Sequence, residues 1–145
     1  MSEATPEFGT PKPGAEIVPR SAAYAVVKDA EGRFLVVRGE SGLFLPGGGA
    51  QAGESPESTV LREVLEEVGA KALVRSHLGD AVQHFSSHGV EFRANMQFFV
   101  ASLETGDVGS GEHEALWLQA ADLSGRFYHE SHEWAVRRAL ESAAT

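Results

Sequence analysis

Three glutamates, Glu63, Glu66 and Glu67, stand at positions i, i+3 and i+4 near the middle of the chain. On a helix that advances about 100° per residue they occupy one sector of the surface, so their charges repel one another. A hard divalent cation such as Mg²⁺ removes this repulsion, because it takes oxygen ligands and bridges carboxylates to phosphates. A solvated acidic helix face is the alternative interpretation of the three glutamates alone.

The residues around these glutamates favour a metal site. Arg62 directly precedes Glu63 and can orient one of the carboxylates. The glycine run 47–49 lets backbone carbonyl and N–H groups approach a ligand without a Cβ in the way. Glu54 stands just before a helix start, where it can hold a water on the metal. A purely structural helix has no need for this combination.

The glutamates must be positioned by a helix that begins at Ser55-Pro56 and ends before Gly69. Ser55 is a good N-cap, Pro56 suits the first helical position, and Gly69 suits the residue after the helix. One apolar stripe is expected, made of Val60, Leu61, Val64, Leu65 and Val68. The three glutamates are then expected on roughly the opposite face.

The rest of the chain alternates β-rich runs with turns and one more helix. Residues 22–29 and 33–38 flank a Gly-containing turn and predict a hairpin. Further strands are expected at 43–45, 72–76, 79–85, 90–103 and 114–118, with a helical turn at 120–123 and an amphipathic helix at 131–143. This order predicts an α/β fold, with a mixed sheet between helices on both faces.

The first 19 residues hold four of the six prolines and little apolar periodicity. This composition predicts a flexible or loosely packed N-terminal arm over residues 1–19. No later linker or repeat divides the chain, so residues 20–145 are expected to form a single domain.

Composition limits the partners of this 145-residue chain. Its formal net charge of −9 argues against a nucleic acid duplex or an anionic membrane as partner, and a metal ion can still recruit a small polyanion. The absence of cysteine rules out disulfides and a thiol nucleophile. No signal pattern or long apolar run is present, so a cytoplasmic protein is expected.

The stretch Gly48–Ala70 resembles the Nudix box, GX5EX7REUXEEXGU, in which U is aliphatic. The matching residues are Gly48, Glu54, Arg62, Glu63, Val64, Glu66, Glu67 and Gly69. Ala70 stands where a larger aliphatic residue is usual, a departure that affects packing and leaves the chemistry intact. The order of hairpin, box, long strand and C-terminal helix also resembles a Nudix domain over almost the whole chain.

This resemblance implies an α/β/α sandwich that hydrolyses a nucleoside diphosphate linked to another group, using Mg²⁺ or Mn²⁺. The metal ligands would be Glu63, Glu66 and Glu67 together with the carbonyl of Gly47. Glu54 would support a metal-bound water, and Arg62 would position Glu63. The backbone of Gly48 and Gly49 would lie against the substrate.

The resemblance leaves the general base open, because members of the family differ in it. Glu112, at the end of a Gly-rich loop, is expected as an extra metal ligand or base, with a box glutamate as the alternative. Arg38 is expected to contact a phosphate, the alternative being an ordinary exposed arginine. Phe85, with His84 beside it, is expected to line the substrate cleft.

The remaining aromatic and imidazole side chains are expected to be structural. The histidines make no zinc pattern and are expected in loops or on the surface, namely His84, His88, His129 and His132. Trp117 and Trp134 are expected in the core or at its rim, where Trp134 could border a base pocket.

Markers of the substrate are mostly missing. No proline stands about fifteen residues after the box, and no tyrosine occurs between residues 70 and 111. Because these markers of other Nudix subfamilies are missing, the chain is most similar to MutT-like enzymes, which convert a (d)NTP to (d)NMP and pyrophosphate. Dinucleoside polyphosphates, ADP-ribose and nucleotide sugars stay open as substrates, as does a non-catalytic nucleotide sensor. The expected partner is a small nucleotide, with the protein a monomer or homodimer.

Overall fold

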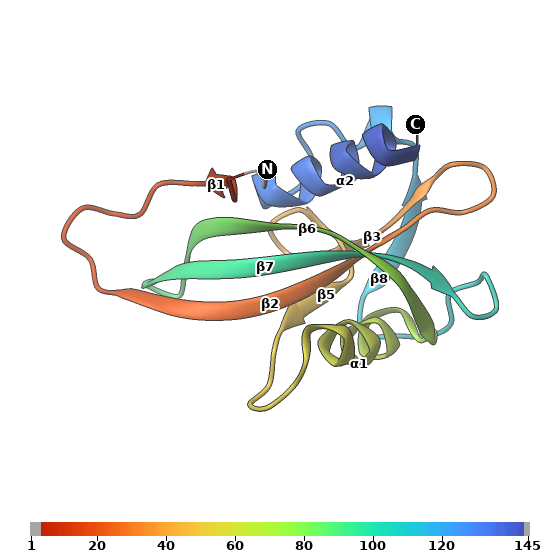
Figure 1. The fold of residues 1–145 in the computed structure, drawn as a ribbon, viewed down its shortest axis with the longest axis horizontal. Helices are drawn as coiled ribbons and strands as arrows, with labels where there is room; N and C mark the ends of the chain where they lie inside the picture. The colour runs from red at the N-terminus through yellow and green to blue at the C-terminus, as the bar shows by residue number, and fades with distance from the viewer. Residues whose placement is uncertain (1–3, 144–145) are drawn as a thin grey trace.

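The computed structural model describes residues 4–143, whose strands form two sheets and whose helices lie outside them (Figure 1). The strands are β1 (Glu7–Phe8), β2 (Ile17–Val27), β3 (Phe34–Arg38), β4 (Leu43–Phe44), β5 (Gly47–Gly49), β6 (Ala72–Ser87), β7 (Val90–Leu103) and β8 (Glu114–Leu118). The helices are α1 (Pro56–Val68), the short 3₁₀ turn η1 (Ala120–Asp122) and α2 (Glu130–Ala143). None of the helices within 4–143 is long and apolar enough to cross a membrane.

The larger sheet is mixed and has the order β1-β6-β7-β2-β5, and the smaller has the order β4-β3-β8. The central pair β2–β7 is parallel, whereas β6–β7 and β2–β5 are antiparallel. Figure 1 shows α1 and α2 on opposite sides of the larger sheet. The predicted α/β/α sandwich with a mixed sheet is confirmed.

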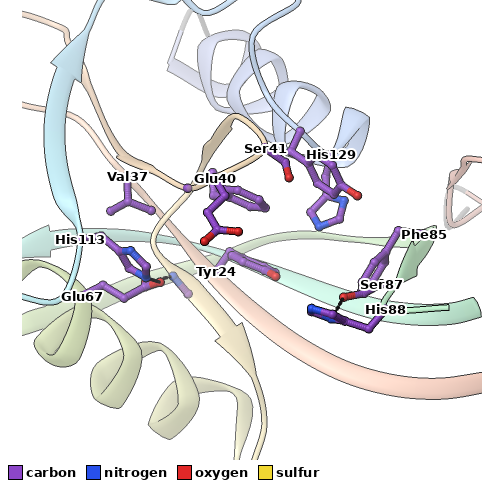
Figure 2. Close-up of a pocket in the computed structure, with 14 residues that line it drawn as sticks. Tyr24, Val37, Glu40, Ser41, Glu67, Phe85, Ser87, His88, His113 and His129 are labelled. Atoms are coloured by element: carbon purple, nitrogen blue, oxygen red, sulfur yellow. Dashed lines mark hydrogen bonds and ion pairs between the residues drawn. The ribbon is translucent and has the colours of Figure 1, made fainter. Parts of the chain in front are cut away.

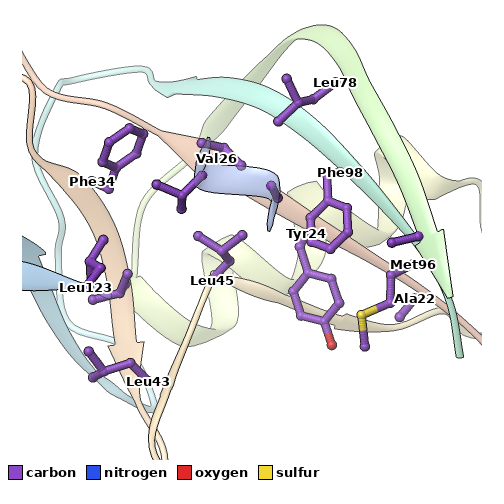
Figure 3. Close-up of a cluster of buried hydrophobic side chains, with 14 of the residues drawn as sticks. Ala22, Tyr24, Val26, Phe34, Leu43, Leu45, Leu78, Met96, Phe98 and Leu123 are labelled. Atoms are coloured by element: carbon purple, nitrogen blue, oxygen red, sulfur yellow. The ribbon is translucent and has the colours of Figure 1, made fainter. Parts of the chain in front are cut away.

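Two apolar cores follow from the alternation of side chains along β2. On one face Ala22, Tyr24 and Val26 pack toward α2, in a core that also includes Phe98 (Figure 3). On the other face the neighbouring residues of β2 pack against α1, in a core that contains Ala23, Ala25, Val27, Val60, Val64 and Val68. Both faces of β2 are therefore buried, which explains its continuous apolar run.

The boundaries of α1 agree with its capping residues. The Ser55 hydroxyl oxygen accepts a hydrogen bond from the Ser58 N–H at 3.1 Å, and Pro56 is the first helical residue. Gly69 ends the helix with a φ of 66°, in the left-handed region that glycine adopts without strain. These local signals fix where the box helix starts and stops.

The predicted apolar stripe of α1 is wrong at its edge. Leu61 and Leu65 are 42% and 52% exposed, while Glu67 is only 8% exposed. Seven residues make nearly two full turns, so Glu67 lies almost above Val60 on the helix. The glutamate therefore belongs to the flank of the buried face, and it does not lie opposite to it.

The predicted hairpin is also wrong, because its two strands enter different sheets. Beyond the turn, only Lys28 and Phe34 form an isolated antiparallel bridge. β2 then pairs with β7 along its whole length, and β3 pairs with β8 and β4. β7 offers β2 a longer partner than β3 does.

Two further boundaries differ from the expectation. The runs 72–76 and 79–85 belong to one strand, β6, which keeps its pairing with β7 across two irregularities in register. Part of the predicted arm is structured, because β1 pairs with β6 and β2 begins at Ile17. The proposed domain boundary at residue 20 therefore falls inside β2.

Candidate active site

The glycine run of the box is β5, a strand at the edge of the larger sheet. The register aligns Ala23 with Gly48, and the neighbouring pairs Ala25–Pro46 and Ser21–Ala50 are joined by backbone hydrogen bonds. In an antiparallel ladder, Gly47 and Gly49 must then direct their N–H and C=O groups to the free edge. Two contacts agree with this, since the Gly47 N–H donates to Glu67 and the Gly49 carbonyl accepts from Arg62.

Gly48 brings the helix close to this edge strand. A Cβ on Gly48 would lie 2.9 Å from Cδ of Glu63, closer than real Cβ contacts allow. The backbone N–H and C=O groups of Gly48 point toward Ala23, away from the free edge of β5. Gly48 therefore contributes to the site through its lack of a side chain. The absence of that side chain is what lets the Glu63 carboxylate lie against β5.

Arg62 ties the box together. Its guanidinium donates to both carboxylate oxygens of Glu54, at 2.7 and 3.0 Å, and to Oε1 of Glu63 at 2.9 Å. It also donates to the Gly49 carbonyl at 3.0 Å and approaches Glu66 at 3.4 Å. The predicted contact between Arg62 and Glu63 is present, and the same side chain joins α1 to β5.

The Glu54 carboxylate is fully engaged. Besides Arg62 it accepts hydrogen bonds from the Gln51 N–H and the Thr59 hydroxyl, at 3.0 and 2.8 Å. These bonds, with Arg62 first among them, lower the pKa of Glu54 to about 2. Glu54 thus holds Arg62 and the helix start in place.

Glu67 is the buried carboxylate of the box. Its Oε1 accepts the Gly47 N–H at 2.8 Å, and its Oε2 lies 3.6 Å from Nε2 of His113. Burial is the largest cause that raises the pKa of Glu67 to about 8; the Gly47 hydrogen bond opposes the rise, and the negative charges of Glu63, Glu112 and Glu66 add to it. The pKa of Glu63 is raised as well, first by burial.

The Gly-rich loop before β8 caps the C-terminal end of α1. The N–H groups of Glu112 and His113 donate to the carbonyls of Glu66 and Glu67, at 2.9 and 3.1 Å. Carbonyls in the last turn of a helix have no partner within it, so the loop satisfies them. This explains how a residue 45 positions after Glu67 in the sequence, the predicted Glu112, comes to lie beside the box.

A cavity of about 420 Å³ opens next to the box (Figure 2). Gly47 and Glu67 form one part of its wall. The other lining residues are mostly aromatic or imidazole side chains, namely Tyr24, Phe44, Phe85, His88, His113, Tyr128 and His129, with Val37, Gly39, Glu40, Ser41 and Ser87 between them. The acidic helix and an aromatic chamber are thus continuous.

Phe85 lines this cavity as expected, stacked on Phe92 with ring centroids 5.2 Å apart. Arg38 does not line it. Its Nε donates to the Glu114 carboxylate at 2.7 Å, across the β3–β8 ladder on an exposed surface. Trp134 lines a different hollow, between α2 and the start of the chain.

The prediction that the histidines lie in loops or at the surface is wrong for His84 and His132, while His129 does lie in a loop, although a buried one. His132 is fully buried in α2, where its Nδ1 accepts the Leu45 N–H at 3.0 Å. His129 is buried against Phe44 and Phe85, and burial lowers its pKa to about 4. The His84 side chain is almost covered and bonds to Glu7 at 2.8 Å.

Several cavity residues were missed at the level of sequence. Tyr24 sits in the middle of an apolar strand run and resembles any core aromatic residue. Phe44, Tyr128 and His129 lie in segments with no motif. Only tertiary folding brings these four together, so no spacing rule could have selected them.

The site residues fit a hard divalent cation. Within residues 4–143 no three acidic or histidine side chains are already grouped as metal ligands, and Glu63 and Glu67 are hydrogen-bonded to Arg62 and to the Gly47 N–H. The donors are nevertheless all oxygens, and the charge of Glu66 helps to raise the pKa of both Glu63 and Glu67. Glu66 keeps 44% of its side chain exposed, so its carboxylate is free to turn toward a cation.

A NUDIX domain family model matches residues 18–140. The chain belongs to the Nudix family. The recognition made from the box is confirmed, and with it the class of enzyme, a Nudix pyrophosphohydrolase that acts on small nucleotide substrates. Hydrolases of this family generally use a divalent metal ion.

Solved Nudix structures share the fold. A Nudix hydrolase from Nitrosomonas europaea is 20% identical, with a TM-score of 0.68 over 86% of this chain and 90% of its own. A MutT protein from Methanosarcina mazei is 23% identical, with a TM-score of 0.68 over 91% of this chain and 100% of its own. An Ap4A hydrolase from C. elegans is 19% identical, with a TM-score of 0.68 over 86% and 98%. A search of curated proteins found no match.

Proposed function

We propose that this Nudix protein hydrolyses a nucleoside triphosphate, (d)NTP, to (d)NMP and pyrophosphate with Mg²⁺, for which Mn²⁺ can substitute. The observation that carries the proposal is the shared wall of the cavity, where Glu67 and Gly47 meet aromatic side chains. A nucleotide has the same two parts, a charged phosphate chain and a flat base. The similarity in fold between this chain and a MutT protein supports the same choice of substrate.

The aromatic side of the cavity accommodates the nucleoside. Phe44 and Tyr128 pack together at 5.5 Å between centroids, and Phe85 packs against His129 at 4.9 Å. Such rings stack on the faces of bases. Within residues 4–143 the Tyr24 hydroxyl has no hydrogen-bond partner, so it is available to a polar group of the base or sugar.

The carboxylate side holds the cation. Glu63, Glu66 and Glu67 would supply carboxylate oxygens, and the Gly47 carbonyl points to the same edge as the N–H that Glu67 accepts. When bound, Mg²⁺ neutralises charge on the phosphates and lowers the pKa of an attacking water. Arg62 keeps the Glu63 carboxylate turned toward β5, while the exposed Glu66 carboxylate can turn toward the cation.

A carboxylate must also take a proton from the attacking water. Glu54 is a poor choice, because its oxygens already accept four hydrogen bonds. Glu112 is exposed, and its charge acts on both Glu63 and Glu67. We assign Glu112 as the base or an additional metal ligand, positioned by its own backbone bond to Glu66.

Product analysis tests the substrate. Canonical nucleoside triphosphates are incubated with the protein and Mg²⁺, and phosphorus NMR identifies the products, with Glu67→Gln as control. Nucleoside monophosphate and pyrophosphate from the wild type are expected. Turnover confined to a dinucleoside polyphosphate, ADP-ribose or a nucleotide sugar would replace the proposed substrate. Binding without turnover of any of them would indicate a sensor.

A further inference from the structure

Arg20 lies on β2 two residues before Ala22, and therefore on the sheet face that carries Tyr24. Its Cζ sits 5.7 Å from the ring centroid of Phe92. Phe92 in turn stacks on Phe85, a wall of the cavity. A row of side chains therefore leads from the cavity to the Arg20 guanidinium.

The same guanidinium lies against the box. A Cβ on Gly49 would come within 2.6 Å of Nη2 and 2.8 Å of Nε of Arg20. Gly49 is two residues along β5 from Gly47, which lines the cavity. At about 3.3 Å per residue, the strand separates the cavity wall from Arg20 by roughly 7 Å.

Arg20 is also unusual in having no oxygen partner. Each of the other arginines in residues 4–143 bonds to a carboxylate, a hydroxyl or a backbone carbonyl, or forms an ion pair, namely Arg33, Arg38, Arg62, Arg75, Arg93, Arg126, Arg137 and Arg138. For Arg20 the structure shows only the packing on Phe92 and Gly49. In a chain of net charge −9, a guanidinium beside the site with no carboxylate on it is notable.

We propose that Arg20 binds the distal phosphates of the substrate, those that leave as pyrophosphate, where the chain passes Gly49. This inference rests on the proposed function and deepens it. A guanidinium presents a planar fork of N–H donors that suits phosphate oxygens. Packing on Phe92 holds this fork in place without using its donors. With the nucleoside in the cavity, the glycine run spans the distance from the base to Arg20.

The proposal makes Arg20 a determinant of phosphate-chain length. A nucleoside monophosphate reaches the cavity and the first glycine, and does not extend to Gly49. A triphosphate, or pyrophosphate alone, does reach the guanidinium. Arg38, the arginine selected from the sequence, is instead neutralised by Glu114.

Calorimetric titration with Mg²⁺ present tests this without turnover. Inorganic pyrophosphate and a nucleoside monophosphate are titrated separately into wild type, Arg20→Gln, Arg20→Lys and Arg38→Gln. The control Arg33→Gln removes one positive charge at a remote turn, where Arg33 pairs with Asp29. Arg20→Gln should weaken pyrophosphate binding about 10- to 100-fold, the range for a charged hydrogen bond, and monophosphate binding less than about threefold. Arg20→Lys should recover part of the loss, because it keeps the charge and lacks the fork.

The outcomes separate this inference from the proposed function. If Arg20→Gln binds pyrophosphate as tightly as the wild type, or if Arg38→Gln alone loses it, Arg20 is not the phosphate ligand, while the proposed function stands. An equal loss for pyrophosphate and monophosphate in Arg20→Gln would indicate a structural effect and overturn the assignment. If the wild type binds neither ligand, the proposed function fails as well.

Discussion

The Gly47 N–H donates a hydrogen bond of 2.8 Å to Oε1 of Glu67, and this bond joins the edge strand β5 to the box helix α1. It fixes a carboxylate where the acidic helix meets the aromatic cavity. The carboxylate is largely buried, and burial raises its pKa to about 8 even though this hydrogen bond acts to lower it. Ionising the Glu67 carboxylate costs free energy in the protein without a cation. The carboxylate lies where a bound cation would stabilise its ionised form.

Replacing Glu67 with Gln should lower Mg²⁺-dependent turnover by about 100-fold or more, the scale for loss of one preorganised charged group. In EDTA the same variant should be more stable than the wild type at pH 8.5. A raised carboxyl pKa favours folding below the unfolded pKa of about 4.5, and that contribution is lost as pH rises through about 8. Turnover assays and thermal melts at pH 5 and 8.5 measure both effects. Near-normal turnover would remove Glu67 from the metal site.

Arg62→Lys should lose the paired contact with Glu54 and the bond to the Gly49 carbonyl. A lysine keeps the charge and has no planar fork. We expect a loss of about 1–3 kcal/mol in the free energy of unfolding, together with a lower kcat. Urea denaturation and steady-state kinetics measure the two effects, with Arg137→Lys, an exposed pair with Glu133, as control. Unchanged kcat would show that Arg62 has no part in positioning Glu63.

Gly48→Ala should damage activity much more than stability. The added Cβ would lie 2.9 Å from Cδ of Glu63, the far end of a flexible side chain that can turn away. A shift of the Glu63 carboxylate by about 1 Å can lower the rate about 100-fold. Ala50→Ser, one residue beyond the run, is a control that adds one atom outside the contact. A variant with normal kcat would mean that the position of Glu63 is not critical.

His129→Phe should make the protein less sensitive to acid. Burial lowers the pKa of His129 to about 4, so its contribution to stability is complete above the unfolded pKa of about 6.5 and is lost as pH falls toward 4. The free energy of unfolding that the wild type loses in this way is roughly 3 kcal/mol, and His129→Phe should avoid part of that loss. His132 stays buried beside it, 5.1 Å away, so some acid sensitivity should remain. Urea denaturation between pH 4 and 7 measures the difference, and parallel curves for the two proteins would contradict it.

The parts of the fold that sequence could predict are those with local causes. Ser55, Pro56 and Gly69 define α1 because a cap acts within one turn of the residue that provides it. The helical spacing of Glu63, Glu66 and Glu67, with Arg62 directly before them, was likewise visible in the sequence. The burial of Glu67 was missed because the predicted apolar stripe included Leu61 and Leu65, which are exposed in the structure.

The parts that sequence could not predict depend on contacts between distant segments. The two strands around the first turn separate because β7, more than 60 residues later, is the longer partner for β2. The cavity combines Tyr24, Phe44, Tyr128 and His129, none of which belongs to a motif. Nothing in the sequence shows that Arg38 pairs with Glu114 in the folded protein, because the two residues are brought together by the pairing of β3 with β8.

The most direct test of the account is whether the α1 carboxylates bind a divalent cation. Mn²⁺ binding is measured by electron paramagnetic resonance for the wild type, Glu63→Gln, Glu66→Gln, Glu67→Gln and the control Glu57→Gln, which changes an exposed acid in the first turn of the same helix. The account predicts Mn²⁺ binding in the wild type and in Glu57→Gln, and a loss of affinity of about tenfold or more in each of the other three. Equal binding by all five proteins would show that the cation, if it is bound, lies somewhere else.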